Sequence, residues 1–213
     1  MTGNTFTAIA SPEIGRQLSA ALAGIAADIA DRRLPKLAAV VLGGGYGRGE
    51  GGVRRTPAGD RLCNDLDFFV FSDGANRREA ARIDKAMRMI ARSWSKELQV
   101  AIDFGPVKNL HALQSVAHRL MFQELLRGRR TVWGEAPLER LIPARPAEAL
   151  PFSEAARLLL NRGMGLWQAG VALRDLLRAP DFILRNIYKA FLGGGDAMLL
   201  AAGRYRWKIE ARR

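Results

Sequence analysis

Seven of the ten residues from 43 to 52 are glycines, and they directly follow the short apolar run 37–42. A short apolar run that glycines stop is typical of a buried strand, and we expect one over residues 37–42. Glycines allow the backbone to approach a ligand closely and to point several N–H groups at it, as phosphate-binding loops do. The segment therefore predicts a strand followed by an anion-binding loop.

Two well-known glycine motifs do not account for this loop. Gly47, Gly49 and Gly52 match G-x-G-x-x-G, but a dinucleotide site needs a helix next, and residues 53–60 contain proline and glycine. The chain has no G-x-x-x-x-G-K-[ST] sequence, which excludes a P-loop. Neither a Rossmann site nor a P-loop site is expected.

Three carboxylates lie in or next to apolar segments, and hydrophobic packing does not explain a charged side chain there. Asp65 and Asp67 stand two apart at the start of the apolar run 66–71, so in a strand both side chains lie on the same face. Asp103 interrupts a third apolar segment, residues 98–104. Neighbouring carboxylates are natural ligands for a hard divalent cation. If the two strands are neighbours, Asp103 completes a cluster of three carboxylates.

In this order, the glycines and carboxylates resemble the nucleotidyltransferase superfamily, which includes DNA polymerase beta, the aminoglycoside nucleotidyltransferases and the minimal nucleotidyltransferases. The family pattern is a strand ending in Gly-Gly or Gly-Ser, an Arg-Gly a few residues later, and then Asp-x-Asp. The matching residues here are Gly44-Gly45, Arg48-Gly49 and Asp65-Leu66-Asp67, followed by the lone strand residue Asp103. Residues 124–128 and 132–134 also resemble the segment after the third carboxylate in the small enzymes of the family, so the resemblance covers roughly residues 37–135.

The chain departs from the family pattern at two places. Gly45 stands where the family often has Ser, whose hydroxyl helps to hold the nucleotide phosphates. The 19 residues between Gly45 and Asp65 form a longer interval than is typical. This interval leaves room for a basic hairpin tip at Arg54, Arg55 and Arg61.

The resemblance implies an enzyme that transfers a nucleoside monophosphate from a nucleoside triphosphate, such as ATP, to an acceptor hydroxyl, with release of pyrophosphate. It implies that Asp65 and Asp67 bridge two Mg²⁺ ions, and that Asp103 binds the acceptor-side ion and accepts the hydroxyl proton. The residues expected to hold the triphosphate are Gly44 and Gly45, through their backbone, with Arg48 and, from the helical part of the chain, Lys189.

The order of apolar patterns predicts an α+β fold: a nucleotidyltransferase-like mixed sheet flanked by helices, followed by an all-α bundle. Residues 1–136 form the expected catalytic domain and residues 150–213 the helical domain, joined by a segment with prolines at 137, 143, 146 and 151. Strands are expected at 37–42, 66–71, 98–104 and 130–133, and helices at 14–29, 77–98, 110–126, 153–168, 171–177 and 182–201. The glycines at 193–195 are interpreted as a turn between helices.

The charge of the chain is strongly basic, with 33 Lys and Arg against 21 Asp and Glu. Such a field favours anionic partners, such as nucleotides or RNA, and disfavours a cationic aminoglycoside as acceptor. Arginines scattered through helices would give the same excess without a binding face. The sequence offers no membrane span and no secretory signal, and its single cysteine forms no disulfide within the chain, so a cytoplasmic location is expected.

Two classes of function fit these features. The first is the active enzyme, whose acceptor is a small molecule, a protein or RNA. In this class, a second copy of the chain is a further possible source of part of the acceptor site. The second is a catalytically silent nucleotide- or RNA-binding module of the same fold. A silent copy is expected to lose at least one of the three carboxylates, and all three are present.

Overall fold

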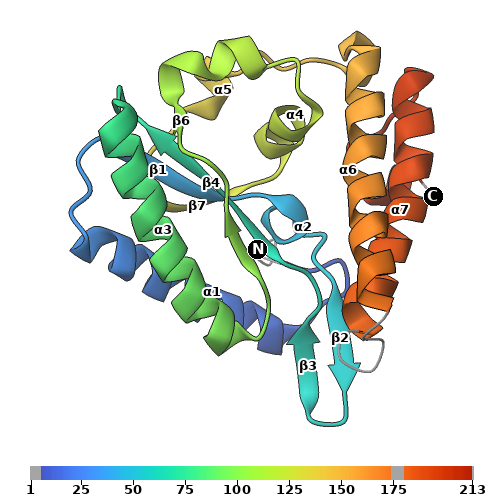
Figure 1. Ribbon diagram of the computed structural model, residues 1–213, viewed down its shortest axis with the longest axis horizontal. Coiled ribbons are helices and arrows are strands. Elements are labelled where there is room, and N and C mark those ends of the chain that lie inside the picture. The colour runs from blue at the N-terminus through green and yellow to red at the C-terminus, as the bar shows by residue number, and fades with distance from the viewer. Residues whose placement is uncertain (1–5, 174–179, 213) are drawn as a thin grey trace. The chain divides into compact units, whose positions relative to one another are not determined.

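The computed structural model describes residues 6–173 and 180–212 (Figure 1). It divides into two compact units. The first comprises the chain up to residue 117 together with residues 121–144, and the second comprises residues 118–120 together with the chain from residue 145 onward. The main division therefore falls inside the proline-containing segment that the sequence predicts as a connector.

The first unit is built on a mixed sheet in the order β5-β4-β1-β7, with β6 also pairing with β4. β1 is antiparallel to β4 and β7, whereas β5 and β6 are parallel to β4. The strands are β1 (Leu37–Leu42), β4 (Leu66–Ser72), β5 (Ile102–Phe104), β6 (Lys108–Asn109) and β7 (Arg130–Gly134). The expected α+β class with a mixed sheet is confirmed, as are the strands at 37–42, 66–71 and 130–133.

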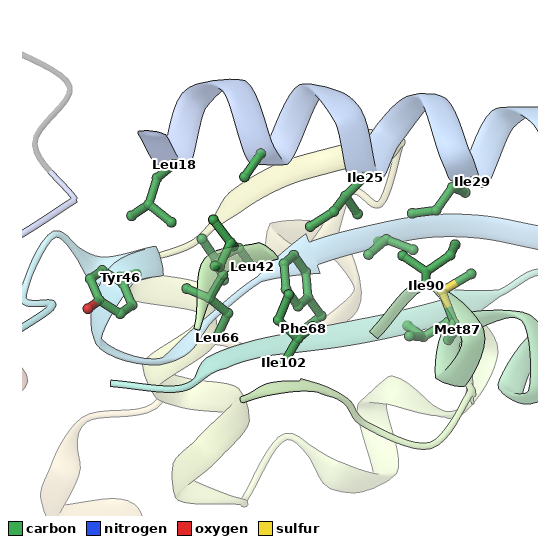
Figure 2. Packing of buried hydrophobic residues seen from close by; sticks show 14 of the residues in the cluster. Leu18, Ile25, Ile29, Leu42, Tyr46, Leu66, Phe68, Met87, Ile90 and Ile102 are labelled. Atoms are coloured by element: carbon green, nitrogen blue, oxygen red, sulfur yellow. The ribbon is translucent and has the colours of Figure 1, made fainter. Parts of the chain in front are cut away.

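Two long helices cover one face of this sheet, α1 (Pro12–Asp31) and α3 (Arg77–Leu98). α1 begins where the Ser11 hydroxyl accepts a hydrogen bond from the Ile14 N–H, and Asn76 caps α3 together with Glu79. Figure 2 shows the apolar stripe of α1 over β1 and β4, with side chains of α3 beside them. The labelled residues of this core are Leu18, Ile25, Ile29, Leu42, Tyr46, Leu66, Phe68, Met87, Ile90 and Ile102.

Shorter elements cover the other face. They are the 3-10 helix η1 (Leu110–Val116), α4 (Leu120–Arg127) and α5 (Leu138–Leu141). Leu113, Phe122 and Leu138 from these elements join Val41 and Phe71 of the sheet in a second buried cluster. Because both faces of β1 and β4 are buried, their sequences read as continuous apolar runs.

The prediction of one helix over 110–126 is wrong, because residues 117–119 interrupt the helical structure between η1 and α4. The Asn109 side chain accepts a hydrogen bond from the His111 N–H and starts η1 separately. At the break, the buried Gln123 side chain donates to the Ala117 carbonyl at 2.8 Å. The bond from Gln123 occupies a carbonyl that a continuous helix would pair, and helical spacing does not reveal it.

Two further elements differ from the expectations. The glycine segment is not a plain loop, since residues Gly44–Arg48 form the short helix α2. The third strand is shorter than predicted, because Gln99 ends α3 with a left-handed backbone and β5 starts only at Ile102. The basic segment after the glycines forms the hairpin of β2 (Val53–Thr56) and β3 (Gly59–Leu62).

The second unit contains two long helices that lie side by side, α6 (Phe152–Ala172) and α7 (Pro180–Ala201) (Figure 1). The 3-10 turns η2 (Ala147–Ala149) and η4 (Ile209–Arg212) accompany them. Residues 171 and 172 belong to α6, so no separate helix starts at 171, and the end of the helix predicted over 171–177 lies outside the described residues. Within the described part of the chain, no helix is long and apolar enough to cross a membrane.

The glycines at 193–195 do not form a turn; they lie inside α7. Gly193 is buried against α6, where an added Cβ would lie 2.5 Å from Arg162 Cγ. On the facing helix, an added Cβ at Gly165 would lie 2.7 Å from Asn186 Oδ1. The glycines therefore permit close packing of two helices, which outweighs their low helix propensity.

Candidate active site

The register of the sheet brings two of the predicted carboxylates together. β4 and β5 run parallel, and Asp67 pairs with Asp103 across them. Paired residues of neighbouring strands point to the same side of a sheet. On the opposite side, the next pair in the register, Phe68 and Phe104, stack with ring centroids 4.7 Å apart. The expectation that these two strands are neighbours is confirmed, and Asp67 and Asp103 share one sheet face.

Asp65 lies before β4 rather than in it. Among the residues that the structure describes, no three His, Cys, Asp or Glu side chains are grouped so that they could hold a metal ion. The expected cluster of three carboxylates is therefore not preformed. Because like charges repel, a third carboxylate has no reason to join the Asp67–Asp103 pair before a cation neutralises it.

Asp67 and Asp103 are the two carboxylates of this sheet that could supply ligands to a metal ion. Asp67 is half-buried and Asp103 is exposed, so neither side chain lies in the buried core of the unit. Mg²⁺ in phosphoryl-transfer sites is commonly held by only one or two carboxylates, with substrate phosphates and water as the other ligands. Two carboxylates on adjacent strands fit that donor set.

Gly44 brings the backbone of α2 directly against Asp67. Its φ is +59°, a conformation that disfavours a Cβ, and an added Cβ would overlap the Asp67 Oδ2 atom. The Gly43 N–H donates to the Asp67 carbonyl oxygen at 2.8 Å. Gly45 differs, since an added Cβ would come no nearer than 3.4 Å to any atom, the nearest being the Glu50 carbonyl oxygen. The structure therefore requires glycine at position 44 and has room for a serine at position 45.

Tyr46 holds the glycine segment to the start of the carboxylate strand, a role that the sequence reasoning missed. Its buried hydroxyl donates to the Gly52 carbonyl at 2.8 Å and accepts from the N–H groups of Cys63 at 3.0 Å and Asn64 at 3.3 Å. Burial raises the pKa of this phenol, so it stays protonated as a donor. A large aromatic residue among seven glycines is the sequence signal that could have identified it.

Asn64 and Gly51 make further contacts that hold the glycine segment in place. The Asn64 side-chain oxygen accepts a hydrogen bond from the Gly52 N–H at 2.8 Å. A Cβ at Gly51 would overlap the ring of Tyr46. The glycines at 51 and 52 thus serve the packing of the segment and not only its flexibility.

Arg48, predicted to contact phosphates, is held by two carboxylates. Its Nε lies 2.9 Å from Glu50 Oε2, and its Nη1 lies 3.4 Å from Glu124 Oε2. Burial on its own would lower the pKa of Arg48, but Glu124 and Glu50 outweigh it, and the pKa is raised. A triphosphate that binds Arg48 has to compete with these two side chains.

The segment from Glu124 to Gly128 supports α2 from outside. An added Cβ at Gly128 would lie 2.5 Å from Arg48 Cγ, so the backbone there packs directly on α2. This contact and the ion pair between Arg48 and Glu124 hold residues 124–128 against α2. The sequence linked the two segments only by resemblance.

Four arginines line a shallow cavity beside α2 that the sequence reasoning did not identify. The cavity has a volume of about 450 Å³, and its lining residues are Gly47, Arg48, Leu126, Arg127, Gly128, Arg129, Arg130, Thr131 and Glu139. Burial lowers the pKa of Arg127 and of Arg130. Arg129 pairs with Glu139, and the Arg130 guanidinium lies 4.1 Å from the centre of the Phe6 ring. Four guanidinium groups line this cavity, two of them paired with the carboxylates of Glu50, Glu124 and Glu139. Guanidinium groups bind anions through charge-assisted hydrogen bonds.

The basic hairpin predicted between the glycines and Asp65 is present. Arg54 and Arg61 are directly opposite each other in β2 and β3, and both are exposed, as is Arg55. The Asp60 N–H donates to Glu13 at 3.0 Å, which ties the hairpin to the start of α1. Lys189 lies on α7 in the second unit, and its contact with a triphosphate stays a prediction.

The chain matches no protein-family model, no curated protein and no solved structure. The resemblance to nucleotidyltransferases therefore rests on the order of the motifs in the sequence.

Proposed function

We propose that the protein is a metal-dependent nucleotidyltransferase, which transfers a nucleoside monophosphate from a nucleoside triphosphate to an acceptor hydroxyl. One observation carries this proposal: Asp67 and Asp103 lie side by side on parallel strands, with the backbone of Gly44 against Asp67. A strand, a glycine turn, an Asp-x-Asp and an acidic residue on the neighbouring strand are the parts that the resemblance requires. We assign a nucleotidyltransferase-like fold to residues 1–136 on this basis.

In the proposed reaction, the acceptor oxygen forms a bond to the α-phosphorus, and the bond between that phosphorus and the bridging oxygen to the β-phosphate breaks. Pyrophosphate leaves, and Asp103 accepts the acceptor's proton. Asp67 and Asp103, with Asp65 from the preceding segment, would hold Mg²⁺. When bound, this cation supplies charge stabilisation on the attacking and leaving oxygens.

The glycine segment supplies the second half of the site. The N–H groups near Gly44 and Gly45 would hold the triphosphate close to Asp67, because the backbone at Gly44 carries no side chain and lies directly against that carboxylate. Arg48, fixed by Glu50 and Glu124, keeps α2 in place and adds positive charge beside the phosphates. Such transfer relies on positioning and charge stabilisation rather than on covalent help from the protein.

The arginine-lined cavity favours an anionic acceptor over a cationic one. It borders Gly47 and Arg48 on α2, the helix whose first residue contacts Asp67. Arginine side chains bind phosphate groups through paired N–H donors. Among the acceptors that the sequence left open, RNA fits this lining best, with a phosphorylated small molecule or an acidic protein surface as the other members of the class.

The experiment is a label-transfer assay. The protein is incubated with each of the four ribonucleoside triphosphates labelled at the α-phosphate, with Mg²⁺ and separate RNA, protein and metabolite fractions, and products are identified by mass spectrometry. The proposal predicts an acceptor heavier by one nucleoside monophosphate, with release of pyrophosphate, and no product from Asp67→Asn. Nucleotide binding without product in any fraction would instead support the silent binding module.

A further inference from the structure

The helix α3 carries a row of basic side chains along its exposed side. Figure 2 shows Met87 and Ile90 of this helix pointing into the core. Lys85 and Arg92 are each two residues from one of them, which places them about 200° around the helix. They belong to a set of exposed residues at intervals of three and four, which form one stripe along a helix. We call this set the basic stripe; it consists of Arg78, Arg82, Lys85, Arg88, Arg92 and Lys96.

The acidic residues of α3 do not neutralise the basic stripe. Glu79 takes part in the helix cap, Asp84 accepts a hydrogen bond from a backbone N–H at 3.3 Å, and Glu97 alone is exposed. Within the described part of the chain, none of the six basic side chains forms an ion pair. Like charges three or four residues apart destabilise a helix, and Arg78 also lies in the first turn, where the helix dipole disfavours a cation. The basic stripe therefore does not serve the stability of α3.

The spacing of these charges fits a strand of nucleic acid. From Arg78 to Lys96 the helix rises about 27 Å, so the basic stripe presents one cation per roughly 5 Å. A nucleic-acid strand carries one phosphate per about 3.4 Å, so about eight phosphates extend along the stripe. Four of the six residues are arginines, whose guanidinium groups match the oxygens of a phosphate through paired N–H donors.

A membrane surface fits this side of α3 less well. A helix that lies on a membrane inserts an apolar face between the lipids. The apolar face of α3 is already buried against the sheet, and of its large apolar side chains, all of which the structure describes, only Met89 is exposed. The exposed side thus offers charge without apolar anchors, which is how proteins contact a phosphate backbone.

We propose that the basic stripe binds the phosphate backbone of single-stranded RNA. The choice of a nucleic acid rests on the charges of α3, and the choice of RNA rests on the proposed function, in which RNA is the favoured acceptor. α3 packs on the sheet face of Phe68, and paired residues next to it, Asp67 and Asp103, lie on the other face. The basic stripe is therefore separate from the carboxylate pair and holds the strand without touching the reacting atoms.

The test is a fluorescence-anisotropy titration of the full chain with a labelled RNA of about twelve nucleotides, long enough to span the stripe, without nucleoside triphosphate or Mg²⁺. The double variant Arg82→Gln with Arg92→Gln should bind roughly tenfold more weakly, and its slope of log affinity against log salt should fall by about 1.4. Its unfolding temperature should not fall, because glutamine is a good helix former and like-charge repulsion decreases. The matched control, Arg16→Gln with Arg140→Gln, removes two exposed cations outside the stripe and should keep the wild-type slope.

Three outcomes would overturn the proposal. The first is a wild-type protein that does not bind the RNA. The second is an equal salt slope for the wild type and the variant with Arg82→Gln and Arg92→Gln. The third is tighter binding to single-stranded DNA, polyglutamate or anionic lipid vesicles, which would assign the basic stripe to that partner. Failure of the proposed function gives a different result, because a protein that transfers no nucleotide can still show the expected loss of RNA binding in this variant.

Discussion

The two compact units place their apolar residues in opposite ways. In the first unit, apolar side chains of the helices and the sheet are buried on both sheet faces, and its exposed large apolar residues are Ile9, Met89 and Met121. In the second, two long helices bury glycine and alanine against each other and expose leucine, phenylalanine and tryptophan. The first unit carries the carboxylate pair Asp67 and Asp103 on one face of its sheet, while the helices of the second unit expose large apolar side chains. The difference is that the first unit buries its large apolar residues in two clusters, whereas the helices of the second unit leave many of theirs exposed.

The largest effect should come from the carboxylates of the first unit. We expect Asp67→Asn or Asp103→Asn to lower nucleotide transfer by roughly a thousandfold or more, because each removes a ligand for a cation that supplies several kcal/mol of charge stabilisation. Thermal unfolding should change little, since neither side chain is buried in the core. The solution mass should stay that of the wild type. A fully active Asp67→Asn variant would show that Asp67 has no role in the reaction proposed for the first unit.

Gly44→Ala should produce the next largest loss. The left-handed backbone of Gly44 makes a side chain unfavourable by about 1–2 kcal/mol, and the new Cβ would displace Asp67. We expect transfer to fall by roughly a hundredfold, as small displacements of reacting groups produce. Steady-state kinetics measures the effect. Full activity in a folded variant would show that the contact between Gly44 and Asp67 is irrelevant to the reaction.

Position 45 offers the matched control for Gly44. Gly45→Ser should retain nucleotide affinity, because its Cβ has ordinary contact distances and the family itself uses serine there. Gly45→Val is bulkier and should weaken binding roughly tenfold to thousandfold, through loss of one or two charge-assisted N–H bonds. Calorimetric titration with a non-hydrolysable triphosphate and Mg²⁺ distinguishes the two. Equal affinities for the wild type and Gly45→Val would show that this segment does not hold the phosphates.

Tyr46→Phe tests how the first unit holds its site in place. The variant removes the donor to Gly52 and the acceptor for two N–H groups. We expect the free energy of unfolding to fall by about 1–3 kcal/mol, the range for leaving buried polar groups unsatisfied. Urea denaturation measures the change. An unchanged denaturation midpoint would mean that water replaces the hydroxyl without loss.

The smallest effects should come from the arginine-lined cavity. Replacing Arg127 or Arg130 by alanine should weaken binding of a single-stranded RNA oligonucleotide and reduce the salt dependence of binding by about one unit of slope. The control is Arg140→Ala, an exposed arginine outside the cavity lining. If all three variants bind RNA alike, the cavity does not recognise the acceptor.

Much of this fold could be predicted from the sequence, because its buried elements have distinct apolar periods. α3 has the predicted bounds, and β1, β4 and β7 lie where short apolar runs predict strands. The sequence could not predict that Asp67 pairs with Asp103, because this pairing depends on which strands are neighbours in the sheet. The sequence carries no local signal for strand order.

Other features depended on contacts between distant residues. The glycines at 193–195 are interpreted from the sequence as a turn, yet Gly193 lies within α7. Its place there is explained by close packing against Arg162, a residue distant in the sequence. The ion pair of Arg48 with Glu124 joins residues 76 positions apart, and residue spacing does not predict it. The hydrogen bonds of Tyr46 to Cys63 and Asn64 are of the same kind. Local patterns identify helices and strands, whereas the supports of the site become visible only in the folded chain.

The most direct test of the central claim is a titration with Mn²⁺, followed by electron paramagnetic resonance, in the presence of a non-hydrolysable nucleoside triphosphate. Mn²⁺ accepts the same oxygen ligands as Mg²⁺. Our account predicts that the wild-type protein binds Mn²⁺ together with the nucleotide, and that Asp67→Asn and Asp103→Asn each lose most of this binding while remaining folded. Equal Mn²⁺ binding by all three proteins would contradict the assignment of Asp67 and Asp103 as the metal-binding pair.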